Sequence, residues 1–150
     1  MVRPPLTIDE QIADVRRWWP SMRAYDIDRD QEAARWVGQV QPQFTSYRLE
    51  LRYRVWGKLE VRVLSPKLVQ QPGNPEGTLP HVYPPIDDPT LCLFDPATYE
   101  WDPHLRIAET ILPWSVRWLA CYEFWLMTGR WVGGGRHADL LPRSLSGLTR

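Results

Sequence analysis

With 150 residues the chain has the length of one domain, and a domain of this size buries roughly 70% of its unfolded surface. Its 18 basic and 18 acidic residues cancel, so the overall positive charge expected of a nucleic-acid-binding protein is absent. Two cysteines are too few for a disulfide framework, and the first ten residues lack a targeting pattern. We therefore expect one cytoplasmic domain over residues 1–150, with a flexible tail from about residue 139 to residue 150.

The first predicted element is a helix that begins after Thr7. Residues 7–10 have the capping-box form, in which the threonine hydroxyl accepts an early backbone N–H and the glutamate reaches back. Apolar residues follow at helical spacing, and Pro20 is expected to end or kink the helix at about Trp19. Residues 25–32 carry four acidic residues and one arginine, which indicates a solvated connection.

A change of hydrophobic period then predicts β-structure. Between residues 47 and 56, apolar side chains alternate with mostly charged ones, as in a strand with one solvated face. Gly57-Lys58 suits a tight turn before a second alternating run over residues 58–63. With residues 35–40, these runs predict a three-stranded antiparallel meander.

Residues 65–90 contain seven prolines, and proline cannot donate a hydrogen bond to a strand ladder. We therefore predict a long ordered loop with at most a short edge strand near His81. Past it, Asp95-Pro96 and Asp102-Pro103 indicate turns.

The last predicted element is a core helix. Thr110 is placed to cap it, Pro113 fits its first turn, and Gly129 suits its end. The apolar run 111–127 is interrupted by two charged residues, and a charge at bilayer depth costs about 2.5–3.5 kcal/mol, so we expect no membrane contact. The glycine run 133–135 predicts a hinge.

Cys92 is the main candidate for chemistry. It follows the proline-rich loop and stands between two leucines, which favours a presented nucleophile, although free cysteines are also often buried. Cys121 lies in mid-helix on a face rich in tryptophan, which indicates core packing. Paired with His81 or His137, Cys92 would form a thiolate–imidazolium pair of the kind found in hydrolases.

Two other classes of site lack support. A metal site would need three or four ligands from the two cysteines and three histidines, and no pair of them has the short spacing of a zinc hook. The glycine run lacks the lysine and hydroxyl of a phosphate-binding loop. We therefore predict no metal and no cofactor.

The order of helix, antiparallel meander, proline-rich loop, cysteine and C-terminal helix resembles the ubiquitin-conjugating E2 fold, an α+β class. The segments 81–84 (HVYP) and 91–93 (LCL) resemble the E2 active-site signature, in which a His-Pro-Asn tripeptide precedes the catalytic cysteine by a similar interval. More specifically, LCLFDP, TILPW and WLACYEFWLMTGRWVGGGRH are similar to bacterial E2-like proteins of antiviral (CBASS-type) defence operons.

This resemblance implies that Cys92 carries the C-terminus of a partner protein as a thioester. The partner would be a ubiquitin-like protein or a cyclic-oligonucleotide-synthesising nucleotidyltransferase, and an E1-like enzyme would activate it. Because the Pro-Asn of the tripeptide is absent, the candidates to stabilise the oxyanion are Tyr83, His137 and backbone N–H groups.

Acidic residues near the cysteine are candidates to orient the attacking amine or to contact the partner. They are Asp87, Asp88 and Asp95, and Trp101 is also predicted to contact the partner. Two alternatives stay open, a non-catalytic E2-like adaptor that binds a partner's tail and a Cys–His hydrolase.

Overall fold

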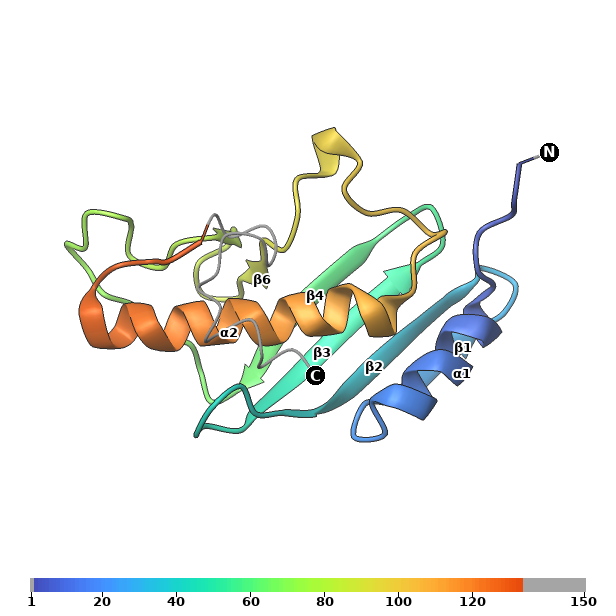
Figure 1. The fold of residues 1–150 in the computed structure, drawn as a ribbon, viewed down its shortest axis with the longest axis horizontal. Coiled ribbons are helices and arrows are strands. Elements are labelled where there is room, and N and C mark those ends of the chain that lie inside the picture. The colour runs from blue at the N-terminus through green and yellow to red at the C-terminus, as the bar shows by residue number, and fades with distance from the viewer. Residues whose placement is uncertain (1, 134–150) are drawn as a thin grey trace.

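Helix α1 (Ile8–Trp18) begins at the predicted capping box. The backbone N–H of Glu10 donates to Thr7 Oγ1 (3.1 Å), and the backbone N–H of Thr7 donates to Glu10 Oε1 (2.9 Å). The helix ends before Pro20, which confirms the predicted boundary. The computed structural model that shows this arrangement describes residues 2–133 of the chain (Figure 1).

Four strands form an antiparallel sheet in the order β1-β2-β3-β4. They are β1 (Arg23–Asp28), β2 (Ala33–Val40), β3 (Tyr47–Arg54) and β4 (Leu59–Ser65). The predicted meander is therefore confirmed for β2, β3 and β4, which pair in chain order. A second, two-stranded sheet joins β5 (Val82–Tyr83) to β6 (Thr90–Leu91), which places the predicted short strand beside His81.

The prediction of a solvated connection over residues 25–32 is wrong, because β1 continues to Asp28 and pairs with β2. This strand lies at the edge of the sheet and most of its residues are exposed, so its composition resembles that of a loop. Its hydrogen bonds come from β2, which the local sequence of β1 cannot reveal. The pairing is irregular at Asp26, whose φ of 52° lies in the left-handed region.

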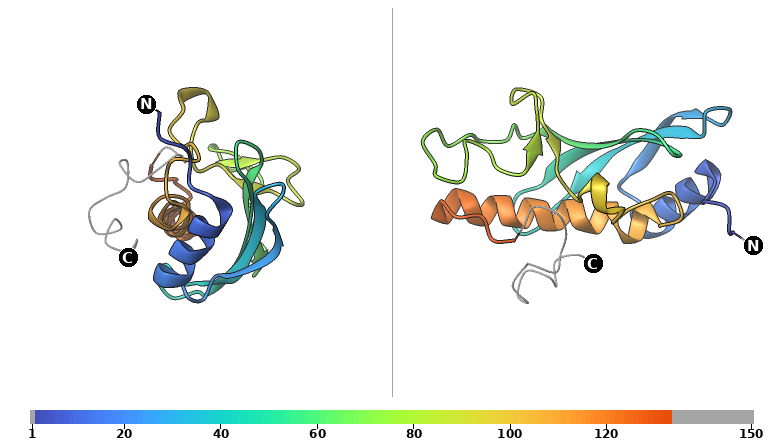
Figure 2. Two further views of the ribbon diagram at one scale, coloured as in Figure 1. Left: turned by 90° about the vertical axis from the view of Figure 1, so that its right-hand side faces the viewer. Right: turned by 90° about the horizontal axis from the view of Figure 1, so that it is seen from above.

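Both helices lie against one face of the four-stranded sheet (Figure 2). Alternate side chains of β3 point into this layer, and Leu49 and Leu51 are fully buried. Helix α2 (Ile111–Thr128) is buried along most of its length, with Trp125 fully enclosed. The aromatic side chains thus form much of the core, as expected from the nine tryptophans of the sequence.

Helix α2 ends as predicted at Gly129, whose φ of 76° lies in the left-handed region and whose N–H donates to the carbonyl of Trp125 (2.7 Å). At the N-terminal end of α2, the prediction that the Thr110 side chain caps the helix is wrong. Thr110 occupies the cap position, but its hydroxyl donates to the carbonyl of Arg106 and accepts from the indole of Trp101. The threonine therefore joins the preceding loop to the helix instead of capping it.

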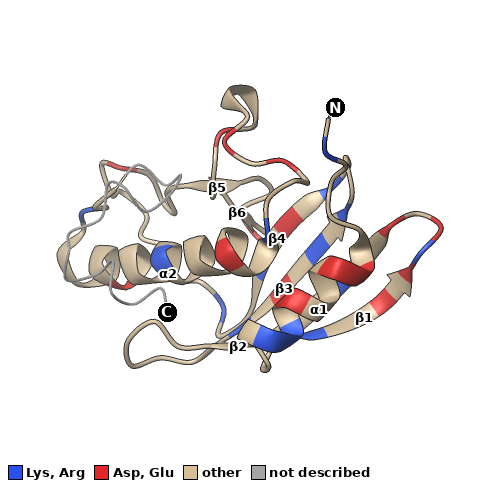
Figure 3. Cartoon of the chain, turned by 45° about the vertical axis from the view of Figure 1, so that its right-hand side comes forward, with Lys and Arg blue, Asp and Glu red and all other residues tan. Residues whose placement is uncertain are grey.

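The charge of the sequence gathers on the strands and on α1, whereas α2 has two charged residues (Figure 3). Of the helices within residues 2–133, none combines the length and the hydropathy that a membrane span requires.

Candidate functional site

Cys92 directly follows β6 and lies half-buried at the surface. The residues on either side of it, Leu91 and Leu93, are buried, with 4% of each exposed. In an extended segment successive side chains point to opposite sides, so packing the two leucines into the core turns the thiol outward. The Leu-Cys-Leu pattern therefore presents the sulfur by the same alternation that forms strands.

The backbone of His81 holds this segment in place. Its carbonyl accepts hydrogen bonds from the backbone N–H of Cys92 (3.0 Å) and from the indole N–H of Trp118 on α2 (2.9 Å). His81 adopts a φ of 58°, in the left-handed region that few non-glycine residues occupy. Two donors on one carbonyl stabilise this conformation and tie the Cys92 segment to α2.

The imidazole of His81 packs against the indole of Trp131, with ring centroids 5.0 Å apart. Burial lowers the pKa of His81, which favours the neutral ring at neutral pH. The structure thus joins His81 to Cys92 through the main chain. The other histidine predicted for the site, His137, lies outside the described residues, as do most of the glycine run and the tail 139–150.

Tyr83 is the side chain that the structure brings to the thiol. The Sγ of Cys92 donates a hydrogen bond to Tyr83 Oη over 3.4 Å, and Tyr83 Oη donates to the carbonyl of Phe94 over 3.4 Å. The pairing of β5 with β6 accounts for this approach, because Tyr83 lies opposite Thr90, two residues before Cys92. Burial and the contact with Cys92 raise the pKa of Tyr83 to about 12.

Two of the three acidic residues predicted for the site, Asp95 and Asp88, have structural partners. Asp95 Oδ1 accepts from the backbone N–H of Ala97 (2.9 Å), which caps a short 3₁₀ helix at Pro96–Thr98. Asp88 accepts from the Nε of Arg62 on β4 over 3.2 Å. Asp87 is exposed in the same loop.

Trp101 lies in the core, with 9% of its surface exposed. Its ring packs edge-on against Tyr53, at a centroid distance of 5.6 Å, and its indole N–H donates to Thr110 Oγ1. These contacts hold most of the side chain inside the protein, and the contact of Trp101 with a partner stays a prediction.

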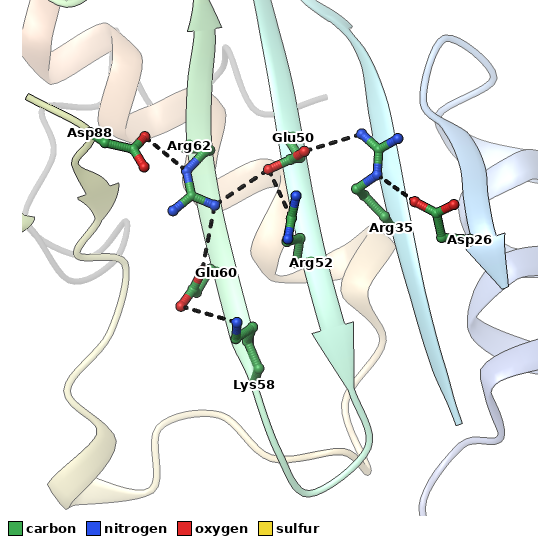
Figure 4. Close-up of polar contacts among 8 residues, drawn as sticks. All are labelled: Asp26, Arg35, Glu50, Arg52, Lys58, Glu60, Arg62 and Asp88. Atoms are coloured by element: carbon green, nitrogen blue, oxygen red, sulfur yellow. Dashed lines mark hydrogen bonds and ion pairs between the residues drawn. The ribbon is translucent and has the colours of Figure 1, made fainter. Parts of the chain in front are cut away.

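The ion pair of Asp88 belongs to a larger network on the outer face of the sheet (Figure 4). At its centre is Glu50, whose side chain is 7% exposed and accepts from three guanidinium groups, those of Arg35, Arg52 and Arg62. Burial raises the pKa of Glu50, but these groups outweigh it and hold the pKa below its usual range. Through Arg62 the network fastens the loop before Cys92 to the sheet.

Beside this loop the surface is hollowed to a volume of about 330 Å³, between the end of β4 and residues 86–89. Its lining combines apolar and charged side chains, with Leu64, Leu68, Leu79 and Ile86 beside Arg62, Lys67, Asp87 and Asp88. A hollow with both apolar and charged lining next to an exposed loop can receive a side chain of another protein.

Cys121 has very different surroundings. It is buried on α2, as predicted, and its Sγ donates to the carbonyl of Val132 over 2.9 Å. Burial raises the pKa of Cys121 to about 12. Within residues 2–133, no three His, Cys, Asp or Glu side chains lie close enough together to hold a metal ion.

Sequence reasoning missed two contributors to the site. Trp118 belongs to the tryptophan-rich face of the predicted C-terminal helix, and its bond to the His81 carbonyl joins residues 37 positions apart, which helical spacing does not indicate. Arg62 was assigned to the solvated face of a strand, which gave no sign of its bond to Asp88.

The family model described as Type II CBASS E2 protein matches residues 11–138, which include the whole sheet, Cys92 and α2. No curated protein matches the chain. The match assigns an E2-like role in bacterial antiviral defence.

Proposed function

Because the chain belongs to the family of type II CBASS E2 proteins, we propose that Cys92 carries the C-terminus of a partner protein as a thioester and passes it to a nucleophile. The observation that supports this most is the exposure of the thiol. Of the two free cysteines, Cys92 is half-buried at the surface and Cys121 is enclosed in the core.

The reaction suits a site with few catalytic groups. The Cys92 thiolate attacks the activated carboxyl carbon at the partner's C-terminus, and the new C–S bond forms as the bond to the leaving group breaks. Before the attack, the Cys92 thiol gives its proton to water. When the leaving group is the thiolate of an activating enzyme, this thiolate takes up a proton after it departs. Exchange of one thioester for another requires an accessible thiolate and correct positioning more than a strong base.

We further propose that the domain is E2-like in fold and that its partner is a ubiquitin-like protein or the C-terminus of a cyclic-oligonucleotide-synthesising nucleotidyltransferase. An E1-like enzyme would supply the activated carboxyl group. The hollow beside residues 86–89 offers a place for a side chain of the partner near the loop that leads to Cys92.

The test is to incubate the protein with its partner and the activating enzyme and to measure intact masses. We expect an adduct that a thiol reductant removes and that maps to Cys92. Cys92→Ala should abolish it, and the matched control Cys121→Ala should retain it. If the partner binds but the wild-type protein never forms the adduct, the chain is an adaptor. Turnover of a small thioester that depends on His81 or His137 would instead indicate a hydrolase.

A further inference from the structure

The hydroxyl of Tyr83 occupies a position from which it can act on the sulfur of Cys92. Within residues 2–133, Tyr83 is the one side chain hydrogen bonded to Cys92 Sγ, at 3.4 Å. The same hydroxyl lies 3.4 Å from the carbonyl oxygen of Phe94. Tyr83 Oη therefore has two partners. The sulfur of Cys92 can both donate and accept a hydrogen bond, whereas the carbonyl oxygen of Phe94 can only accept one.

The direction of these hydrogen bonds depends on the protonation of the sulfur. A neutral Cys92 donates its proton to Tyr83 Oη, and the phenol directs its own proton to the Phe94 carbonyl. A thiolate has no proton and can only accept. Rotation about the phenolic C–O bond then turns the Tyr83 proton toward the sulfur without moving any heavier atom, and a hydrogen bond to an ionised group is stronger than one between neutral groups.

The phenol keeps its proton under the conditions in which it would be needed. Burial, together with the contact with Cys92 and the negative charge of Asp95, raises the pKa of Tyr83 to about 12. Below that pH the phenol is protonated and can donate. The imidazole of His81 packs on Trp131, and burial lowers its pKa, so it supplies no positive charge to the sulfur at neutral pH.

We propose that Tyr83 is a catalytic residue whose hydroxyl donates a hydrogen bond to the Cys92 thiolate and so prepares the sulfur for attack on the partner's carboxyl carbon. This role deepens the proposed function and rests on it. It also gives this chain a thiolate-stabilising group within the segment where E2 enzymes carry their tripeptide.

Alkylation of Cys92 by iodoacetamide as a function of pH tests this without any partner, with the label located by peptide mass spectrometry. Tyr83→Phe removes the hydroxyl and keeps the ring. Because the lost bond to the thiolate is stronger than the lost bond to the thiol, we expect the midpoint of alkylation to rise by about one pH unit. The matched control is Tyr99→Phe, which removes a hydroxyl from an exposed tyrosine seven residues beyond Cys92 and should leave the midpoint unchanged.

A second variant keeps the hydroxyl and changes its strength. Replacement of Tyr83 by 3-fluorotyrosine gives a more acidic phenol and a better donor, so the midpoint should fall, in the direction opposite to that of Tyr83→Phe. A packing role for Tyr83 would not produce these opposite shifts. A midpoint that stays at the wild-type value in both Tyr83 variants overturns the proposal.

The alkylation and adduct experiments separate the two proposals. If the midpoint shifts but the wild-type protein forms no thiol-labile adduct, Tyr83 stabilises the thiolate and the thioester function is wrong. If the adduct forms at Cys92 and the midpoint does not shift, the function stands and the role of Tyr83 is wrong.

Discussion

The two cysteines of this chain occupy environments that differ in exposure and in the hydrogen-bonding partner of the sulfur. Cys92 follows β6 and is half-buried, and its sulfur donates a hydrogen bond to the hydroxyl of Tyr83. Cys121 lies inside α2, buried, with its sulfur donating to a backbone carbonyl that can only accept. Burial and a partner that only accepts favour the neutral thiol of Cys121, whereas Cys92 is accessible and its hydroxyl partner can both donate and accept. The reactivity of a cysteine thus follows from the element that carries it and from the groups around its sulfur.

The largest expected effect is a difference in alkylation rate between the two thiols. At pH 8, a thiol with a pKa of about 12 is ionised in about one molecule in 10,000. We therefore expect Cys121 of the native protein to react with iodoacetamide more than about 100-fold more slowly than Cys92. Peptide mass spectrometry over a time course measures both rates. In urea the two rates should converge, and similar rates in the native protein would contradict the comparison.

Replacing one of the two leucines that turn Cys92 outward should destabilise the segment that carries Cys92. Leu93 is 4% exposed, and a buried Leu→Ala substitution typically costs about 2–5 kcal/mol. We expect Leu93→Ala to lower the free energy of unfolding in urea by that amount. Leu105→Ala, at a residue that is 36% exposed, should cost less than about 1 kcal/mol. Equal losses in both variants would show that Leu93 does not anchor the segment.

The link between the two regions is the indole of Trp118, which lies on the same helix as Cys121 and donates to the carbonyl beside Cys92. Trp118→Phe keeps an aromatic ring and removes the donor, and we expect a loss of about 1–2 kcal/mol in urea unfolding. The control is Trp18→Phe at an indole that is 62% exposed, where the free energy of unfolding should hardly change. A Trp118→Phe protein as stable as wild type would mean that this bond does not hold the site.

The smallest expected effect concerns Asp88. Its ion pair with Arg62 is exposed on the carboxylate side, and exposed pairs contribute about 0–1 kcal/mol. Asp88→Asn should therefore change the free energy of unfolding by less than about 1 kcal/mol, and added salt should reduce the difference. A loss of several kcal/mol in the free energy of unfolding would show that the network around Glu50 depends on Asp88.

The parts of the fold that follow from local sequence were predictable. The capping box at Thr7, the alternation in β3 and β4, and the glycine after α2 each act within a few residues. Strand β1 was missed because an exposed edge strand takes its hydrogen bonds from a neighbour and carries the polar residues of a loop. Long-range contacts account for the other misses.

The candidate site also has one part that follows from local sequence and another that depends on long-range contacts. The exposure of Cys92 follows from its place between two apolar residues in an extended segment. Its approach to Tyr83 depends on the pairing of two short strands, for which the sequence predicted only one member. The double role of the His81 carbonyl depends on an indole from α2, so no local pattern could indicate it.

The most direct test of the central claim is the intact mass of the protein after reaction with its activated partner. We expect an increase equal to the mass of the partner less one water, attached at Cys92, released by a thiol reductant and unaffected by Cys121→Ala. An adduct that persists in Cys92→Ala, or that maps to another residue of the chain, would contradict it.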